Sequence, residues 1–358
     1  MTVHPLLAEA LHAHGGLERW RQAGLTWSPV DDITFRVTRS RDIRAPTMGE
    51  LFQSPLALLN TVSIPANTTL NPTNTAVSRS VFAPQSGSST LKPEVANTFG
   101  VGVVLKPSFL PGFGASIDYY RIDIQDAIIT PTAQNTIDQC NQGDAASCQR
   151  VNLAASPGVV SVNPVNFARQ LARGIDFEAS YRQDLANISS GLKGALTLRF
   201  LGTRFLENTL NSGIPGVPVY NNVGYEYIYG AAPPKFKYSI NLVYEGGPLL
   251  ASVTMRGISA GTYNPSYIEC TSSCPAATLA HPTIEDNHVP GATYFDTSFT
   301  YKLPGGFEAY LAVDNLLNKD PVMVAVGPSI GQAPLSVNPN NYDVLGRTFR
   351  LGVRFKLK

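Results

Sequence analysis

The sequence predicts an all-β chain whose strands form part of an antiparallel transmembrane β-barrel. Three observations support this prediction: the composition, the regular alternation of apolar and polar residues, and the rhythm of the connections. Only 15% of the 358 residues are charged, whereas Gly (30), Pro (27), Phe (16) and Tyr (15) are plentiful. Aromatic and turn-forming residues in this mixture are typical of strands separated by turns.

The alternation of apolar and polar residues is clearest in the last segment of the chain, where the apolar positions are Phe349, Leu351, Val353, Phe355 and Leu357. Residues two apart lie on one face of a strand, so this segment has one apolar and one polar face. About eleven segments show this pattern, at roughly 18–28, 31–41, 94–106, 112–126, 171–184, 192–206, 235–245, 248–260, 291–303, 306–318 and 345–357. A tilted strand crosses a bilayer in about 9–11 residues, and these segments are long enough to do so.

The connections between the segments alternate between short and long. The short ones are turn-like, as at 245–248 and 303–306, and the long ones cover roughly 42–93, 127–170, 207–234, 261–290 and 319–344. Long loops are uncommon in compact soluble domains. In outer-membrane barrels, short turns lie on the periplasmic side and long loops lie outside. The rhythm therefore favours a barrel of this type.

Charge and hydropathy exclude several other classes. The chain has 27 basic and 26 acidic residues, and this balance argues against nucleic acid as the main partner because phosphate binding needs a basic excess on one face. No apolar run approaches the roughly 18 residues of a transmembrane helix. Residues 1–17 lack the basic and apolar regions of a secretory signal peptide. We predict a non-barrel lead-in over 1–17 and a barrel portion over 18–358.

The four cysteines form two local pairs, Cys140 with Cys148 and Cys270 with Cys274. Both pairs lie in predicted long loops, and the favoured interpretation is two loop disulfides in an oxidising compartment. A zinc site is the alternative, since four cysteines can bind zinc, although neither pair has C-x-x-C spacing.

Motifs for catalysis and cofactor binding are absent from the sequence. It contains no G-x-S-x-G, H-E-x-x-H or Walker A motif, so we predict no enzyme activity, no cofactor and no metal site. His281 and His288 flank Glu285 and Asp286, a grouping that is more simply read as solvated loop residues than as a metal cluster.

Arginines recur at the polar positions of the predicted strands. If the apolar faces meet lipid, these side chains point into the lumen: Arg36, Arg121, Arg182, Arg199, Arg350 and Arg354. They would then contact a solute or a plug domain, or simply form salt bridges in a wet interior.

Several motifs together resemble the TonB-dependent receptor family. Residues 44–52 are similar to its R-x-P-x-x-x-E-L-F signature, 91–94 to its L-x-P-E element, and 313–319 to its penultimate hairpin. The matching positions are Arg44, Pro46, Glu50, Leu51, Phe52, Pro93, Glu94, Asn315, Leu316, Gly346 and Arg347. The order and spacing of these motifs span about residues 18–358.

The resemblance implies a plugged barrel of about 22 strands in the outer membrane. It implies uptake of a scarce small-molecule nutrient (a siderophore, a vitamin or an oligosaccharide), with outer-membrane lipid and the barrel-assembly machinery as partners. The alternating final strand, Phe349 to Leu357, resembles the signal that this machinery reads. The chain departs from the family by ending on Lys358 rather than on an aromatic residue.

A second departure is that the chain has no region similar to the family's plug, its TonB-contacting segment or the first half of its barrel. We therefore expect a truncated or partial product of a longer gene, with the TonB complex reached only through the missing N-terminal region. The alternative is a secreted soluble β-sandwich that binds carbohydrate. That alternative explains the alternation but not the length of the strands or the rhythm of the loops.

Overall fold

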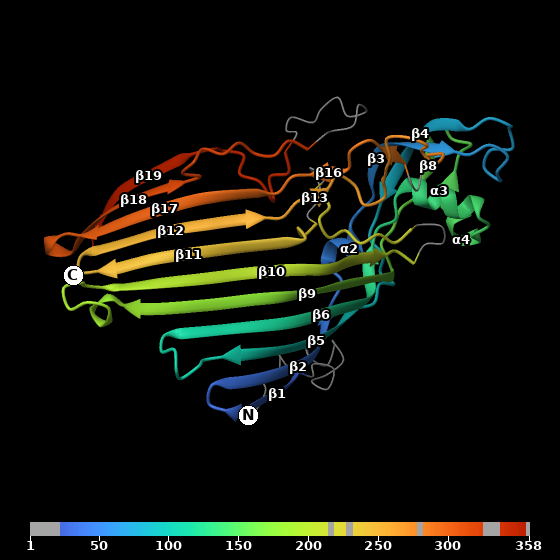
Figure 1. Ribbon diagram of the computed structural model, residues 1–358. Helices are drawn as coiled ribbons and strands as arrows, with labels where there is room; N and C mark the ends of the chain where they lie inside the picture. The colour runs from blue at the N-terminus through green and yellow to red at the C-terminus, as the bar shows by residue number, and fades with distance from the viewer. Residues whose placement is uncertain (1–21, 214–217, 227–231, 278–281, 325–336, 356–358) are drawn as a thin grey trace.

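An eleven-stranded antiparallel sheet dominates the computed structural model, which describes residues 22–213, 218–226, 232–277, 282–324 and 337–355 (Figure 1). In spatial order its strands are β1 (Gln22–Val30), β2 (Ile33–Arg44), β5 (Glu94–Leu105), β6 (Phe113–Ile129), β9 (Val165–Asp184), β10 (Ala195–Asn211), β11 (Phe236–Gly246), β12 (Leu249–Ile258), β17 (Ala292–Lys302), β18 (Phe307–Asp314) and β19 (Thr348–Phe355). The order follows the sequence throughout. The predicted antiparallel barrel strands are confirmed, and the lead-in over 1–17 lies outside the described residues.

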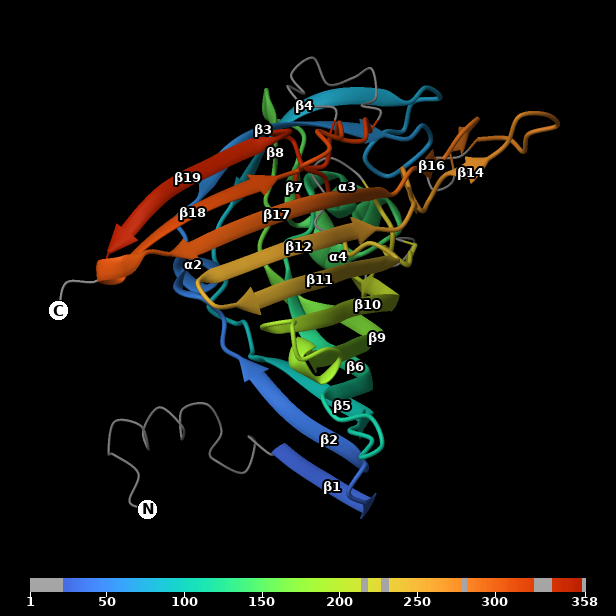
Figure 2. The same cartoon turned by 60° about the vertical axis from the view of Figure 1, so that its left-hand side comes forward.

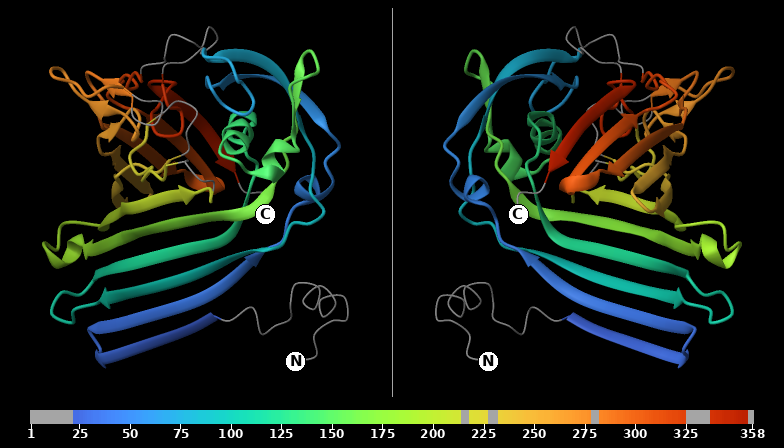
Figure 3. Two further views of the ribbon diagram at one scale, coloured as in Figure 1. Left: turned by 90° about the vertical axis from the view of Figure 1, so that its right-hand side faces the viewer. Right: turned by 90° about the vertical axis from the view of Figure 1, so that its left-hand side faces the viewer.

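The sheet is a curved wall with two free ends (Figure 3). Strand β1 pairs only with β2, and β19 pairs only with β18, within the part of the chain that the structure describes. Each end strand therefore presents one edge of backbone N–H and C=O groups without strand partners. Such edges are costly in a hydrocarbon layer, where no water is present to satisfy them.

Three central strands extend well beyond the length needed to cross a bilayer. Strands β6, β9 and β10 contain 17, 20 and 17 residues. Their pairing continues as far as Ile129 opposite Val165 and Asn211 opposite Arg169. The strands thus run on into segments that the sequence pattern assigned to loops, because each extension is paired with its neighbour.

The first two long connections are not structureless, contrary to expectation. They form a second sheet of β3 (Leu56–Ile64), β4 (Val77–Gln85), β8 (Gly158–Val160) and β7 (Val151–Asn152), covered by α3 (Ala133–Asn141) and α4 (Ala145–Cys148). We call this the loop unit. Its core contains Val62, Ile64, Val81, Ile137 and Val160, all at most 1% exposed.

The remaining long connections gather at the same end of the main sheet (Figures 1 and 2). They include the short strands β13 (Gly261–Thr262), β14 (Ile268–Glu269), β15 (Thr283–Ile284) and β16 (His288–Val289). Helix α2 (Met48–Phe52) belongs to the first long connection, between β2 and β3. At the opposite end, short turns include 3₁₀ segments η2 (Leu185–Asn187) and η3 (Pro304–Gly306). None of the helices described is both long and apolar enough to cross a membrane.

The two faces of the main sheet differ in chemistry. Side chains of one face are apolar yet exposed, as Leu25 (68%), Trp27 (61%) and Leu351 (80%) illustrate. Register aligns such residues across strands, for example Val37 with Val101 and Leu242 with Val253. An exposed apolar band backed by a polar face is the arrangement of a membrane-spanning barrel wall.

Candidate functional site

The polar face of the sheet is lined with paired charges. Arg199 on β10 binds Glu178 on β9 at 2.7 Å, and Thr203 donates to Asp176 at 2.6 Å. Further ion pairs on this face are Arg36–Asp118 (2.5 Å), Arg256–Asp296 (2.6 Å), Arg350–Asp314 (2.9 Å) and Arg354–Glu308 (3.2 Å). A hollow of about 510 Å³ lies along Arg36, Asp118, Asp176 and Glu178. The face therefore offers fixed charges of both signs to a solute.

One arginine predicted to face the lumen lies on the other face. Arg121 is two and four residues from Tyr119 and Ile117 on β6, and its partner in the sheet is Phe99, which is 42% exposed. Alternation places all of these side chains on the apolar face. The prediction was wrong for Arg121 because its charge was weighed above its position in the alternation.

The first loop junction joins three positions of the family motifs. Arg44, at the end of β2, binds Glu94 at the start of β5 at 2.5 Å and Glu50 in α2 at 3.0 Å. Glu94 also accepts a hydrogen bond of 2.7 Å from the Ile128 backbone N–H. The carboxylates thus hold α2 and the end of β6 to the same arginine.

Helix α2 is closed at its start by a capping box. The Thr47 hydroxyl accepts from the Glu50 N–H at 3.2 Å, and Glu50 accepts from the Thr47 N–H at 2.7 Å. The hydrogen bond from Arg44 is the main reason that the pKa of Glu50 falls to about 2. Sequence alone suggests this box, since Thr precedes Glu by three residues.

The backbone of the Leu51–Phe52 motif lies against the segment that leads back to the sheet. Gly87 N–H donates to the Gln53 carbonyl at 2.9 Å, and Ser88 N–H donates to the Glu50 carbonyl at 2.8 Å. A Cβ on Gly87 would lie 2.5 Å from the Leu51 carbonyl carbon, so this approach requires glycine. Pro46 and Pro93 flank the junction, immediately before α2's cap and before β5 respectively.

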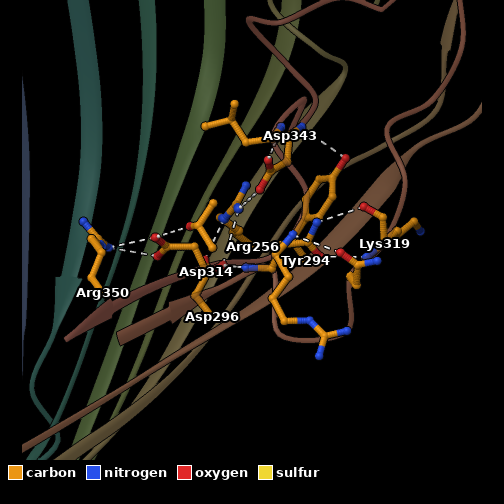
Figure 4. A network of polar contacts seen from close by, with 12 residues as sticks. Arg256, Tyr294, Asp296, Asp314, Lys319, Asp343 and Arg350 are labelled. Carbon is orange, nitrogen blue, oxygen red and sulfur yellow. Dashed lines mark hydrogen bonds and ion pairs between the residues drawn. The ribbon is translucent and has the colours of Figure 1, made fainter. Parts of the chain in front are cut away.

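The second loop junction is centred on Arg256 of β12 (Figure 4). This guanidinium binds Asp296 on β17 at 2.6 Å and Asp343 in the last long connection at 2.9 Å. It also lies 4.7 Å from the centre of the Tyr294 ring, whose hydroxyl accepts from the Asp343 N–H at 3.2 Å. Arg256 therefore ties the last loop to the polar face.

The penultimate-hairpin motif supports the same junction. Asn315 is fully buried, its N–H donates to Asp296 at 2.8 Å, and its side chain bonds both backbone groups of Lys319. Leu316 N–H donates to the Phe295 carbonyl at 2.6 Å. Arg347 N–H donates to the Asn318 side chain at 3.0 Å, directly after Gly346, whose φ of 70° suits glycine.

A buried carboxylate lies beside this junction. Glu226, in the connection after β10, is 0% exposed, and one of its oxygens accepts from Asn341 at 2.7 Å and from Asn338 at 3.4 Å. Its other oxygen has no hydrogen-bond partner among the residues described. Burial raises the pKa of Glu226, and burial likewise raises the pKa of nearby Tyr342. Glu226 could not be identified from the sequence, because no motif surrounds it.

Two cavities open among the long connections. One, of about 430 Å³, is lined by Thr136, Gln139, Asp144 and Arg150 beside α3 and α4. The other, of about 240 Å³, is bounded by Lys237, Arg256, Tyr294, Asn341 and Asp343. Both lie at the loop end of the sheet, and each has charged and polar side chains in its lining.

Both predicted cysteine pairs are disulfide-bonded. Cys140–Cys148 links α3 to α4 inside the loop unit, and Cys270–Cys274 closes an exposed loop after β14. Among the residues described, no group of three His, Cys, Asp or Glu side chains could hold a metal. His281 lies outside these residues.

The residues of the final strand lie on the exposed apolar face. Phe349, Leu351, Val353 and Phe355 are between 61% and 80% exposed. Leu357 lies outside the described residues. Their role as an assembly signal remains a prediction.

Together, the exposed apolar band, the ion-paired polar face and the long outer connections define a transmembrane β-barrel protein. The chain belongs to the TonB dependent receptor-like β-barrel family, whose sequence model matches residues 21–316. This is a family of outer-membrane receptors and transporters. No curated protein matches the chain in sequence.

Solved structures share the fold. A mutant of the ferric enterobactin receptor PfeA from Pseudomonas aeruginosa, in complex with enterobactin, is similar with a TM-score of 0.58 at 13% identity. The siderophore receptor PirA from Acinetobacter baumannii has a TM-score of 0.57 at 13% identity. Each match covers 93% of this chain but only 40% of the receptor, so the chain spans well under half the length of these proteins.

Proposed function

We propose that this chain is the C-terminal barrel portion of a TonB-dependent outer-membrane receptor that takes up a scarce nutrient. The polar face carries the proposal, because fixed charges of both signs line one side of a wall whose other side suits lipid. Such a wall would bound a hydrated path for a solute. Coupling to TonB would depend on segments other than this wall, and the chain would act as a transporter rather than as an enzyme.

The free edges support a partial barrel. In a membrane, the outer edges of β1 and β19 require strand partners, and we propose that further strands of a longer gene product supply them. The intact mass of the native protein in the outer-membrane fraction tests this proposal. A mass well above 38.5 kDa is expected, whereas a monomeric, transport-competent species of 38.5 kDa would overturn it.

A ferric siderophore is the nutrient that we would test first, because the solved receptors with this fold include those for ferric enterobactin and for another siderophore. Vitamins and oligosaccharides are the other classes to compare. The experiment deletes the gene and measures growth with each nutrient as the sole source of iron, vitamin or carbon. Loss of growth on one class, restored by the intact gene, is expected. Unchanged growth and uptake for all three classes would contradict the proposal.

The alternative of a secreted carbohydrate-binding β-sandwich finds no support in the main sheet. A sandwich buries the apolar faces of its sheets against each other, but here Phe349, Leu351 and Val353 are more than 60% exposed. Membrane fractionation separates the two functions, since the proposed receptor requires detergent for extraction.

A further inference from the structure

A band of arginines lies on the apolar face of the main sheet, at the end that leads into the long connections. Its members come from strands β2, β6, β9 and β10, and all are exposed: Arg39, Arg41, Arg121, Arg169, Arg173 and Arg204. We call them the arginine band. None of them belongs to the polar face described above.

Register fixes the band directly beyond the apolar belt. One row across the sheet contains Val37, Val101, Tyr119 and Ile175, which are successive partners on β2, β5, β6 and β9. The next row on the same face, two residues further along each strand, contains Arg39, Phe99, Arg121 and Arg173. Arg204 pairs with Ile175 and therefore lies at the end of the first row. Between the two rows the face changes from mainly apolar to mainly cationic within one step of the alternation.

The charges of the band are only partly balanced by protein carboxylates. Asp123 binds Arg169 at 2.5 Å and Arg121 at 3.1 Å, and Glu207 binds Arg173 at 2.6 Å. Arg39, Arg41 and Arg204 have no ion-pair partner within the described parts of the chain. Two carboxylates thus face six guanidinium groups.

The arrangement also brings like charges together. Arg121 and Arg173 are direct partners across β6 and β9, a placement that destabilises a sheet when nothing offsets it. Strands lie about 4.8 Å apart, so Arg39 is separated from Arg121 by about 10 Å, with Phe99 between them. An anionic group placed over Phe99 would be within reach of both long side chains.

We propose that the arginine band binds the phosphate groups of a phosphorylated lipid in the outer leaflet of the membrane. Guanidinium groups bind phosphate in bidentate geometry, and headgroups lie at the level where an apolar belt ends. The acyl chains of the lipid would then cover Val37, Val101 and Ile117. The proposal rests on the proposed outer-membrane location, but not on the identity of the nutrient.

Three arginines can be changed without breaking an ion pair of the protein. The variant Arg39→Gln/Arg41→Gln/Arg204→Gln leaves the contacts of Asp123 and Glu207 in place. The matched control, Lys106→Gln/Lys193→Gln, removes exposed cations from the short turns at the other end of the wall. Both variants are made in the full-length receptor that contains this chain and are extracted from the outer membrane in detergent.

The measurement is the affinity of each protein for a diphosphorylated glycolipid, with its dephosphorylated form and inorganic phosphate as further probes. Each arginine near an anionic surface contributes about fivefold to affinity, so the triple variant should bind the lipid about a hundredfold more weakly. The control should bind as the unchanged receptor does. The proposal would be overturned if the triple variant bound the lipid as tightly as the unchanged receptor does, or if the receptor bound the dephosphorylated lipid equally well. If inorganic phosphate bound as tightly as the lipid, the arginine band would be a site for free anions instead.

Fractionation of the unchanged receptor separates this outcome from a failure of the proposed function. Recovery in the outer membrane without lipid binding would refute the arginine band alone. Recovery outside the membrane would refute the proposed location and the lipid site together. Loss of lipid binding in the triple variant with nutrient uptake unchanged would support the lipid site independently of the nutrient.

Discussion

The guanidinium of Arg36 on β2 reaches the carboxylate of Asp118 on β6 across the intervening strand β5. The two hydrogen bonds measure 2.6 and 2.5 Å. Gly102 is the residue of β5 that pairs with both Arg36 and Asp118. A Cβ at this position would lie 1.9 Å from an Asp118 carboxylate oxygen. The missing side chain of Gly102 therefore makes room for an ion pair between strands that are not neighbours.

Gly102→Ala should displace this ion pair and destabilise the sheet. The added methyl group must push Asp118 aside, and overpacking of this kind costs about 1–3 kcal/mol. The measurement is urea unfolding of the receptor in detergent. Gly24→Ala on β1 is the matched control, because the nearest atoms to its Cβ are 4.0 Å away. Equal midpoints for the two variants would show that Gly102 has no such role.

Acidification should release α2 from the first loop junction. The pKa of Glu50 is lowered from an ordinary 4.5 to about 2, chiefly by Arg44. Its contribution is therefore fully present above about pH 4.5 and is lost as the pH falls toward 2. Hydrogen exchange at the Gly87 and Ser88 amides, which bond α2 and its C-terminal flank, reports this release.

Arg44→Gln tests the cause of that pH dependence. Without the guanidinium, exchange at Gly87 and Ser88 should accelerate at a higher pH, closer to 4.5. Arg79→Gln on β4 changes an arginine outside the junction and should leave the profile unchanged. If Arg44→Gln has the profile of the unchanged protein, then the ion pair does not govern the docking of α2.

The main sheet could be predicted from sequence because its signal is local. Alternation over a few residues identifies each strand, and short turns order the strands as antiparallel neighbours. The loop unit could not be predicted in the same way. Its core brings Val81 next to Gly158 through a parallel pairing between distant segments, and no local pattern specifies such a contact.

The site was predictable only where a motif marked it. The motif positions Arg44, Glu50 and Glu94 were identified, but their mutual contact required the folded chain. No sequence motif identifies Glu226, because its partners in the folded chain, Asn338 and Asn341, are more than a hundred residues away in the sequence. The alternation of β6 already places Arg121 on the apolar face, so the pattern was right for this residue and only the interpretation of its charge was wrong.

Reduction of Cys140–Cys148 should loosen the loop unit. This disulfide links α3 to α4, and Cys140 is only 1% exposed within the core. Closing a loop of this size is worth about 2–3 kcal/mol in the chain-entropy account. Cys140→Ser/Cys148→Ser should therefore be cut faster by protease within 130–160, without a change in the protection of the main sheet.

Cys270→Ser/Cys274→Ser provides the comparison for that prediction. This disulfide closes a loop in which Cys274 is exposed, and residues 270–274 belong to neither hydrophobic core of the described parts of the chain. Its loss should increase cleavage only near 270–274. Equal cleavage of the loop unit in both variants would mean that the Cys140–Cys148 link does not stabilise α3 and α4.

Glu226→Gln should stabilise the last loop junction at neutral pH and remove its pH dependence. Burial raises the pKa of Glu226 above its ordinary value of 4.5. The folded junction therefore binds a proton more readily than the unfolded chain does, so its stability is greatest below about pH 4.5 and declines as the pH rises through the raised pKa. A neutral glutamine keeps an oxygen that accepts from Asn341 but carries no buried charge.

Hydrogen exchange at the amides of residue 226 and Thr262, which donate to the carbonyls of Thr262 and Gly224 respectively, measures the effect. Exposed Glu269, changed to Gln, is the control for the loss of a carboxylate. Faster exchange in Glu226→Gln at neutral pH would show that the charged form of Glu226 stabilises the junction.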